Sequence, residues 1–170
     1  MDEMKTNVCD IISARLSGLG FCALVPKEFG GISVLLRDMD LPFGQEVDVR
    51  AYGRSWEIRE CDGRVLCCGE RVLAADFRSV LGALEKSFRK YDEVVRISNI
   101  TPEKLELSFK SGRKFIFWGT DDDAACDMFF PDGLCYSFYS RKGYFVLPGD
   151  VPFSFDAAEH YEIILNDGEN

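Results

Sequence analysis

Apolar residues recur at helical spacing in one stretch of the chain, Asp76–Tyr91. Asp76 is placed to cap its first turn, and Lys90 carries positive charge near its carboxyl end. The apolar positions share one face of a helix: Phe77, Val80, Leu81, Leu84 and Phe88. We therefore expect a long amphipathic helix here, with its apolar face on the core.

A second, shorter helix is predicted near the N-terminus, where Val8, Ile11, Ile12, Leu16 and Leu19 form an apolar stripe. Most of the other segments have the residues and the alternation of strands. They are Phe21–Val25, Ile32–Arg37, Glu46–Tyr52, Val94–Ile100, Leu105–Phe109, Lys114–Trp118, Tyr144–Pro148 and His160–Leu165. The pattern predicts an α+β fold, in which β-dominant antiparallel sheets of hairpins pack on the long helix.

Turn residues predict how the strands pair. Asp62-Gly63 favours a two-residue turn that pairs Ile58 with Cys67 and Glu60 with Val65. Pro131-Asp132-Gly133 closes a second hairpin, which places on one face Met128, Phe130, Leu134, Tyr136 and Phe138.

Gly112 closes a third hairpin, and the length of its loop decides which residues face inward. A three-residue loop puts on one face Leu105, Leu107, Phe109, Phe115 and Phe117. A two-residue loop would instead bring Ile116 and Trp118 to that face, and we favour the first. Because both faces of the strand Lys114–Trp118 are apolar, we expect it at the centre of a sheet.

The length of 170 residues predicts a single globular domain, residues 1–170. Each half of the chain consists of a helix followed by strands and contains an Asp-Gly hairpin. An internal duplication, about residues 1–73 and 74–165, would explain this order. The alternative is that hairpins in general share this turn chemistry.

Composition indicates a folded, reduced, intracellular protein. Apolar residues make up 46% and aromatic residues 13% of the chain, which excludes wholesale disorder. No apolar run reaches the roughly 20 residues that cross a membrane, and the first residues are polar and acidic. The 7 cysteines are odd in number and follow no disulfide framework, so we expect free thiols and a cytoplasmic location.

Negative charge is concentrated in the last third of the chain. The net charge is −9, and residues 119–170 hold eleven acids and two bases. This balance argues against nucleic acid and is compatible with a basic protein partner. The alternative is that the charge keeps a Phe-rich protein in solution.

No motif for catalysis, for a cofactor or for a metal is found in the sequence. His160 is the single histidine, no CxxC is present, and no glycine-rich phosphate loop occurs. We therefore predict a non-enzymatic protein without catalytic, cofactor-binding or metal-binding residues.

The densest acidic cluster is Asp121, Asp122, Asp123 and Asp127, which lacks the ligand order of an EF-hand loop. Three interpretations stay open: a solvated loop, weak binding of a divalent ion, and contact with a basic partner.

One part of the chain resembles known sequences. It consists of WEIRECDGRVLCCG, the amphipathic helix, KLELSFKSGRKFIFW and the PDG hairpin. This order resembles uncharacterised families of small bacterial proteins, some of which are similar to immunity proteins of toxin systems. Those families have a Trp at the start of the PDG hairpin, where this chain has Asp127-Met128. The resemblance implies a cytoplasmic bacterial protein without catalysis and carries over no functional residue.

The first hypothesis is an acidic protein-interaction domain, and an immunity-type inhibitor of a basic toxin is its specific form. The candidate partner-binding residues are Asp121, Asp122, Asp123, Asp127, Phe129 and Tyr139. The alternative is a small-ligand-binding domain or hydrolase, with an aromatic-lined pocket between helix and sheet. A third is a subunit that self-associates through the strand His160–Leu165, so a monomer and a homodimer are both open.

Overall fold

Within the residues that the computed structural model describes, the chain forms two antiparallel sheets and two short helices. The described residues are 8–27, 30–42, 44–89, 91–101, 104–118, 124–139, 143–148 and 163–164. The helices are α1 (Val8–Leu16) and α2 (Phe77–Ser87), and a 3-10 helix, η2 (Gly69–Leu73), precedes α2.

Sheet A has the strand order β1-β2-β3-β9-β10-β11-β12. Its strands are β1 (Gly20–Pro26), β2 (Ile32–Arg37), β3 (Val47–Ala51), β9 (Ala124–Phe129), β10 (Leu134–Tyr139), β11 (Gly143–Pro148) and β12 (Ile163–Ile164). Sheet B has the order β5-β4-β8-β7-β6. Its strands are β4 (Trp56–Arg59), β5 (Val65–Cys68), β6 (Val94–Thr101), β7 (Lys104–Phe109) and β8 (Lys114–Trp118).

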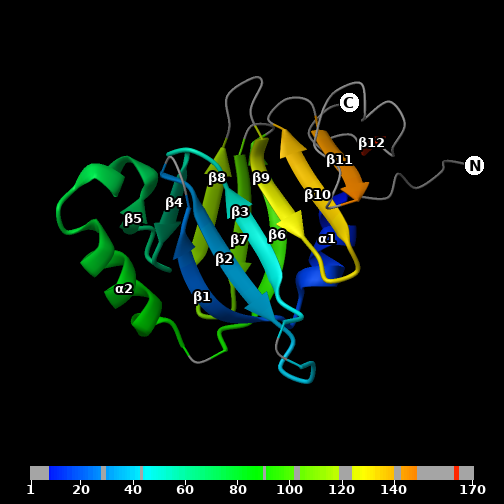
Figure 1. The fold of residues 1–170 in the computed structure, drawn as a ribbon, viewed down its shortest axis with the longest axis horizontal. Coiled ribbons are helices and arrows are strands. Elements are labelled where there is room, and N and C mark those ends of the chain that lie inside the picture. Colours follow the sequence, from blue (N-terminus) through cyan, green and yellow to red (C-terminus); the bar gives the residue numbers. More distant parts are fainter. Residues whose placement is uncertain are drawn as a thin grey trace, which may run out of the picture.

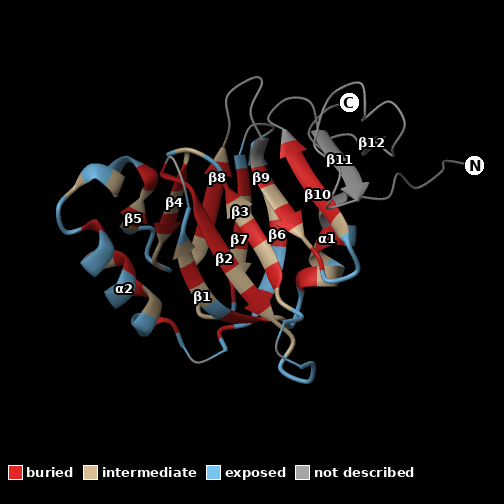
Figure 2. Cartoon of the chain, in the orientation of Figure 1, coloured by how far each residue is buried: buried red, intermediate tan, exposed pale blue. Residues whose placement is uncertain are grey.

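The two sheets stack face to face around one core. In Figure 1 sheet A lies nearer the viewer, sheet B lies behind it, and the helices stand at opposite ends of the stack. The rings of Phe21 in β1 and Phe109 in β7 meet with centroids 6.3 Å apart. Trp56 of sheet B donates its indole N–H to the carbonyl of Gly30 over 2.8 Å. Buried residues recur along the strands, while the outward side of α2 is exposed (Figure 2).

The predicted α+β arrangement is wrong. The helix expected over Asp76–Tyr91 is only 11 residues long and ends at Ser87, and the sheets do not pack on one long helix. Each sheet has a continuous apolar face, so each covers the other, and a single helix is too narrow to do so. Instead, α2 fills one open end of the stack with Phe77, Leu81 and Leu84.

The ends of α2 also differ from the expectation. Asp76 makes no side-chain capping bond and pairs with Arg71, with 2.9 Å between the Arg71 Nη2 and Asp76 Oδ2 atoms. Phe88 leaves the helix with extended backbone and stacks on Phe21, with 3.9 Å between the ring centroids. Burial of this ring between the sheets therefore ends the helix before Tyr91.

Three hairpins share one turn geometry. Glu60, Phe109 and Phe130 each donate a backbone N–H to the carbonyl four residues later. Each loop thus has three residues and ends in a glycine with positive φ, which glycine adopts without a steric penalty.

This geometry confirms the three-residue loop at Gly112, because Leu107 pairs with Phe115. It also confirms the central position of β8. The pairing of Ile58 with Cys67 is confirmed. The pairing of Glu60 with Val65 is wrong, because the extra loop residue shifts the register and leaves Val65 exposed.

The two halves of the chain interleave. The first half places β1-β2-β3 in sheet A and the hairpin β4-β5 in sheet B, whereas the second places β6-β7-β8 in sheet B and β9-β10 in sheet A. The halves join where β3 pairs with β9 and where β4 pairs with β8. This arrangement is consistent with a duplicated unit, and the duplication itself stays a prediction.

Each helix lies against a strand of the other half. Ser13 of α1 donates its hydroxyl to the Ile97 carbonyl of β6 over 3.0 Å and accepts from the Ile97 N–H over 2.9 Å. Glu85 of α2 accepts from the Leu24 N–H of β1 over 2.9 Å. The helices thereby satisfy backbone groups at the edges of β6 and β1, which otherwise invite another strand to pair.

Candidate interaction site on sheet A

Two rows of side chains cross the outer face of sheet A, the side turned away from sheet B. The first row runs across β2, β3, β9 and β10 as Ser33, Arg50, Asp127 and Ser137. The second row runs across the same strands as Leu35, Asp48, Phe129 and Cys135. Tyr52 follows β3 and reaches the first row. We call Ser33, Asp48, Arg50, Tyr52, Asp127, Phe129 and Ser137 the outer patch.

Arg50 lies at the centre of the outer patch. Its Nη2 atom is 2.6 Å from Asp48 Oδ2, and its guanidinium carbon is 4.8 Å from the centroid of the Phe129 ring. The side chains are partly covered, with 30% of Arg50 and 19% of Asp48 exposed. A charge pair at this depth is screened less than one on an open surface.

Asp127 is a carboxyl group in an unfavourable place for a charge. Burial raises its pKa, while hydrogen bonds from Ser137 and Tyr52 and the charge of Arg50 oppose that shift. The pKa of the Tyr52 hydroxyl is also raised, first by burial and then by the neighbouring Asp127 charge. Tyr52 therefore stays protonated near neutral pH, and its hydroxyl donates a hydrogen bond to the Asp127 carboxylate.

Several polar atoms of the outer patch are buried without a hydrogen-bond partner. They are Ser33 Oγ, Asp48 Oδ1, Arg50 Nε and Asp127 Oδ1. An unsatisfied buried group costs about 1–3 kcal/mol, so such groups are uncommon and mark a place where a donor or acceptor can still bind. Two of the four are carboxylate oxygens, which only a donor or a cation can satisfy.

Cys126 of β9 and Cys135 of β10 do not form a reactive site with this patch. Burial raises the pKa of Cys135 to about 12, with the Asp127 charge as a further cause. Burial also raises the pKa of Cys126 well above its usual value. Both stay protonated near neutral pH and lack the thiolate that a nucleophile requires.

The structure brings together two of the predicted partner-binding residues. Asp127 and Phe129 lie on the same face of β9, two residues apart. The predicted residues Asp121, Asp122 and Asp123 fall outside the described residues, as does the side chain of Tyr139.

Sequence reasoning missed the groups that surround this pair. Asp48, Arg50 and Tyr52 alternate with buried residues along Glu46–Tyr52, so the alternation already placed them on one outer face. Nothing in the sequence showed that β9 would lie beside β3. The pairing of these distant strands creates the outer patch.

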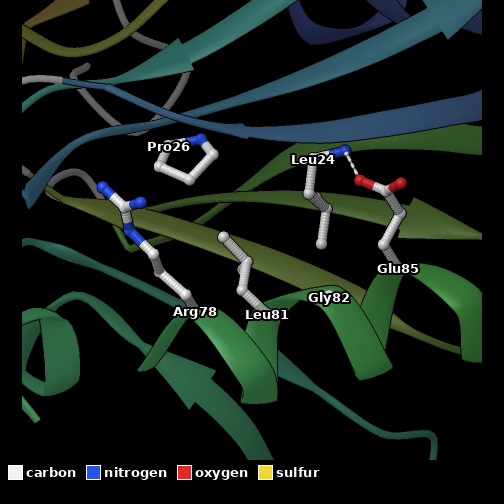
Figure 3. Close-up of a pocket in the computed structure, with 6 residues that line it drawn as sticks. All are labelled: Leu24, Pro26, Arg78, Leu81, Gly82 and Glu85. Carbon is white, nitrogen blue, oxygen red and sulfur yellow. Dashed lines mark hydrogen bonds between the residues drawn. The ribbon is translucent and has the colours of Figure 1, made fainter. Parts of the chain in front are cut away.

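A second candidate lies between α2 and β1 (Figure 3). This hollow of about 420 Å³ is lined by Leu24, Pro26, Arg78, Leu81, Gly82 and Glu85. Among the residues that the structure describes, its lining contains neither Phe nor Tyr, in contrast to the aromatic pocket that the sequence led us to expect. Glu85 already accepts the Leu24 N–H, so Arg78 is the charged side chain still available to orient a ligand among the described lining residues.

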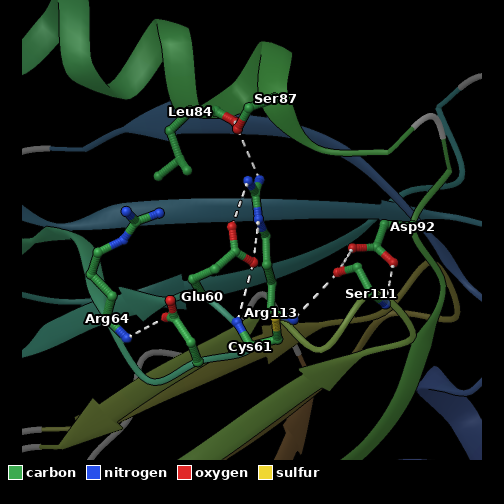
Figure 4. Close-up of polar contacts among 9 residues, drawn as sticks. Glu60, Cys61, Arg64, Leu84, Ser87, Asp92, Ser111 and Arg113 are labelled. Carbon is green, nitrogen blue, oxygen red and sulfur yellow. Dashed lines mark hydrogen bonds and ion pairs between the residues drawn. The ribbon is translucent and has the colours of Figure 1, made fainter.

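A third polar cluster joins two turns to the end of α2 (Figure 4). Arg113 pairs with Glu60 at 3.2 Å, donates to the Ser87 hydroxyl at 2.9 Å and lies over the Phe88 ring. Beside it, Ser111 donates to the buried Asp92 from its backbone N–H and its hydroxyl. These groups satisfy one another, which indicates a structural role.

Other kinds of site can be examined in the part of the chain that the structure describes. Within those residues, no three His, Cys, Asp or Glu side chains gather as a metal ion would require. No described helix combines the length and the apolar character needed to span a membrane. The sole histidine, His160, lies outside that part.

Comparison with known proteins gives no match: no family model, no curated protein and no solved structure matches the chain. The resemblance to small bacterial families therefore stays a prediction.

Proposed function

We propose that this protein is a non-enzymatic interaction domain that binds a basic protein through the outer patch of sheet A. The observation that carries the proposal is the pair of buried carboxylate oxygens, Asp48 Oδ1 and Asp127 Oδ1, which have no donor. They lie on neighbouring strands, and Asp48 is directly opposite Phe129. A cation from a partner would satisfy both oxygens.

The composition of the outer patch supports this choice of partner. Carboxylates beside an aromatic ring attract a positively charged side chain through charge and through the face of the ring. The net charge of −9 adds long-range attraction that speeds the encounter with a basic protein. The tyrosine at the rim, Tyr52, is of the kind that contributes strongly to protein interfaces.

An immunity-type inhibitor of a basic toxin is the specific form of this proposal. Such an inhibitor works by covering its target and needs no catalytic group of its own. The raised pKa values of Cys126 and Cys135 agree with a protein that uses no thiolate there.

The alternative function is a small-ligand-binding domain that uses the hollow between α2 and β1. Its volume of about 420 Å³ falls in the range of small-molecule sites, about 300–1,000 Å³. One rim cation, Arg78, would select an anionic ligand. The outer patch has more unsatisfied groups, so we favour the interaction domain.

Capture from a lysate of the source organism tests the proposal. The baits are the native protein, the double variant Asp48→Asn/Asp127→Asn, and the control Glu57→Gln, which removes an acid paired with Arg59 on sheet B. We expect one basic protein to bind the native and control baits and to lose at least tenfold in affinity with the double variant. Its association rate should fall as salt is raised.

A captured protein that the double variant retains at full affinity would overturn the site. A fourth bait, with Asp121, Asp122 and Asp123 changed to Asn, tests the acidic cluster predicted from the sequence as a contact. Loss of binding with this bait alone would move the contact away from the outer patch.

A further inference from the structure

Arg50 occupies a setting of the kind that receives an arginine from another protein. It has a carboxylate within 2.6 Å, an aromatic ring at 4.8 Å and the Asp127 charge opposite it on β9. Carboxylates and ring faces are the two groups that bind a guanidinium best. Arg50 therefore fills, within the free protein, a cation site on the outer patch.

The fit of Arg50 to this site is incomplete. Its Nε has no acceptor, and one oxygen of each carboxylate, Asp48 and Asp127, has no donor. Ser33, directly opposite Arg50 on β2, is 0% exposed and its hydroxyl is also unpaired. Donors and acceptors in the same patch thus remain unmatched.

The backbone explains this mismatch. Arg50 and Asp48 are two residues apart on β3, so the arginine must fold back along its own strand to reach the acid. In that position its guanidinium group leaves Asp127 Oδ1 without a donor. An arginine of a partner that approaches the outer face of sheet A has no such constraint and can place its guanidinium group between the two carboxylates.

We propose that Arg50 is a built-in competitor for an arginine of the basic partner, which must displace Arg50 from Asp48 to bind. This inference rests on the proposed function and names the group that the site takes. With 30% of its side chain exposed, Arg50 has an open path to solvent. The displaced Arg50 side chain then lies at the rim of the outer patch. The partner arginine replaces its positive charge beside Asp48, so the net charge next to the two carboxylates is unchanged.

Sheet B supplies the matched control. Arg59 pairs with Glu57 at 2.8 Å, again two residues apart on one strand. The residues opposite Arg59 are Lys114 on β8 and Val65 on β5, so no carboxylate lies opposite this arginine as Asp127 does opposite Arg50. Arg50→Met and Arg59→Met remove the same charge from the protein, but only Arg50→Met opens the site between two acids.

The test measures binding of an acetylated Gly-Arg-Gly-Arg-Gly amide by amide chemical shifts in ¹⁵N spectra. We expect Arg50→Met to bind the peptide about fivefold more tightly than the native protein. In the native protein the peptide must first break the partly exposed Arg50–Asp48 ion pair, whereas the variant lacks that pair. Arg59→Met should bind as the native protein does. The shifts should centre on β3 and β9, and the dispersion of the spectrum shows that each variant is folded.

Each other outcome overturns the inference. Equal affinity of the native protein and Arg50→Met at the outer patch would leave the proposed function in place and remove the competitor role. Weaker binding by Arg50→Met would make Arg50 part of the contact itself. Absence of binding at the patch in every variant would reject the proposed function as well. Arg50→Gln repeats the test if Arg50→Met fails to fold.

Discussion

The surroundings of a single carboxyl group decide how it responds to pH in this protein. Asp127 loses hydration on burial, and its pKa rises. Glu60 is half-buried beside Arg113, and hydrogen bonds from Arg113 and from the Cys61 N–H lower its pKa. The two groups therefore contribute to stability with opposite signs.

Asp127→Asn should increase the free energy of unfolding, relative to the native protein, more at neutral pH than at acid pH. Because the folded pKa of Asp127 is raised, the folded state binds the proton more tightly than the unfolded state does. The penalty is absent below the ordinary value of 3.8 and grows as pH rises through the folded pKa. Urea unfolding should show that the free energy of unfolding of the variant, relative to the native protein, increases as pH rises across this range and is constant at higher pH. A constant difference at every pH would contradict this account.

Glu60→Gln should show the reverse. A lowered pKa gives stability that is present above the ordinary value of 4.5 and is lost as pH falls through the folded pKa. The variant should be less stable at pH 7 and equal to the native protein in strong acid. Glu70→Gln, at an exposed position, serves as the control. Urea unfolding over the same pH series measures the stability of the variant and of the control. A loss of stability in Glu60→Gln that persists in acid would indicate lost packing contacts and not a lost charge interaction.

At the scale of elements, the helices stabilise the fold at its edges. Ser13→Ala removes the only group of α1 that bonds both the N–H and the carbonyl of Ile97 among the contacts described. We expect a loss of about 1–3 kcal/mol in the free energy of unfolding, because two backbone groups lose their partner. Amide exchange at Ile97 should also become faster. Ser17→Ala, at an exposed position one turn later, should change neither quantity.

The sequence predicted individual hairpins better than their assembly. Gly112 and the alternation around it were enough for the inward set of β7 and β8, because the turn and the pattern are local. The role of α2 was not predictable in this way. Its apolar stripe fits a sheet face as well as the end of a stack, and the choice depends on how sheets far apart in sequence cover each other.

In the candidate site too, the local features were predictable from the sequence, whereas the assembly of distant strands was not. Asp127 and Phe129 were singled out from acidity and aromatic content, and the structure places both on the outer patch. Asp48 and Arg50 went unnoticed because an alternating strand ordinarily presents charges to solvent. Only the pairing of β3 with β9 turns these charges into a partly buried group with unmatched atoms.

At the scale of the whole molecule, neither half should fold without the other. Each three-stranded meander is extended by a hairpin from the other half, and each helix packs on the other half's strand. We expect fragments 1–73 and 74–170 to be unfolded separately and to regain cooperative β structure when mixed. Circular dichroism and thermal melting of the separate and mixed fragments would measure this. A fragment that melts cooperatively by itself would contradict it.

The interleaved halves also constrain how the chain folds during its synthesis. β3 ends at Ala51, yet its neighbour β9 begins only at Ala124. At about 5–20 residues per second, the ribosome needs roughly 4–15 seconds to supply that strand. Throughout this interval the first meander has an unpaired edge, and its apolar face stays uncovered until sheet B, whose last strand ends at Trp118, is complete. A nascent chain of this topology therefore depends on chaperones, or on synthesis faster than aggregation, until its second half emerges.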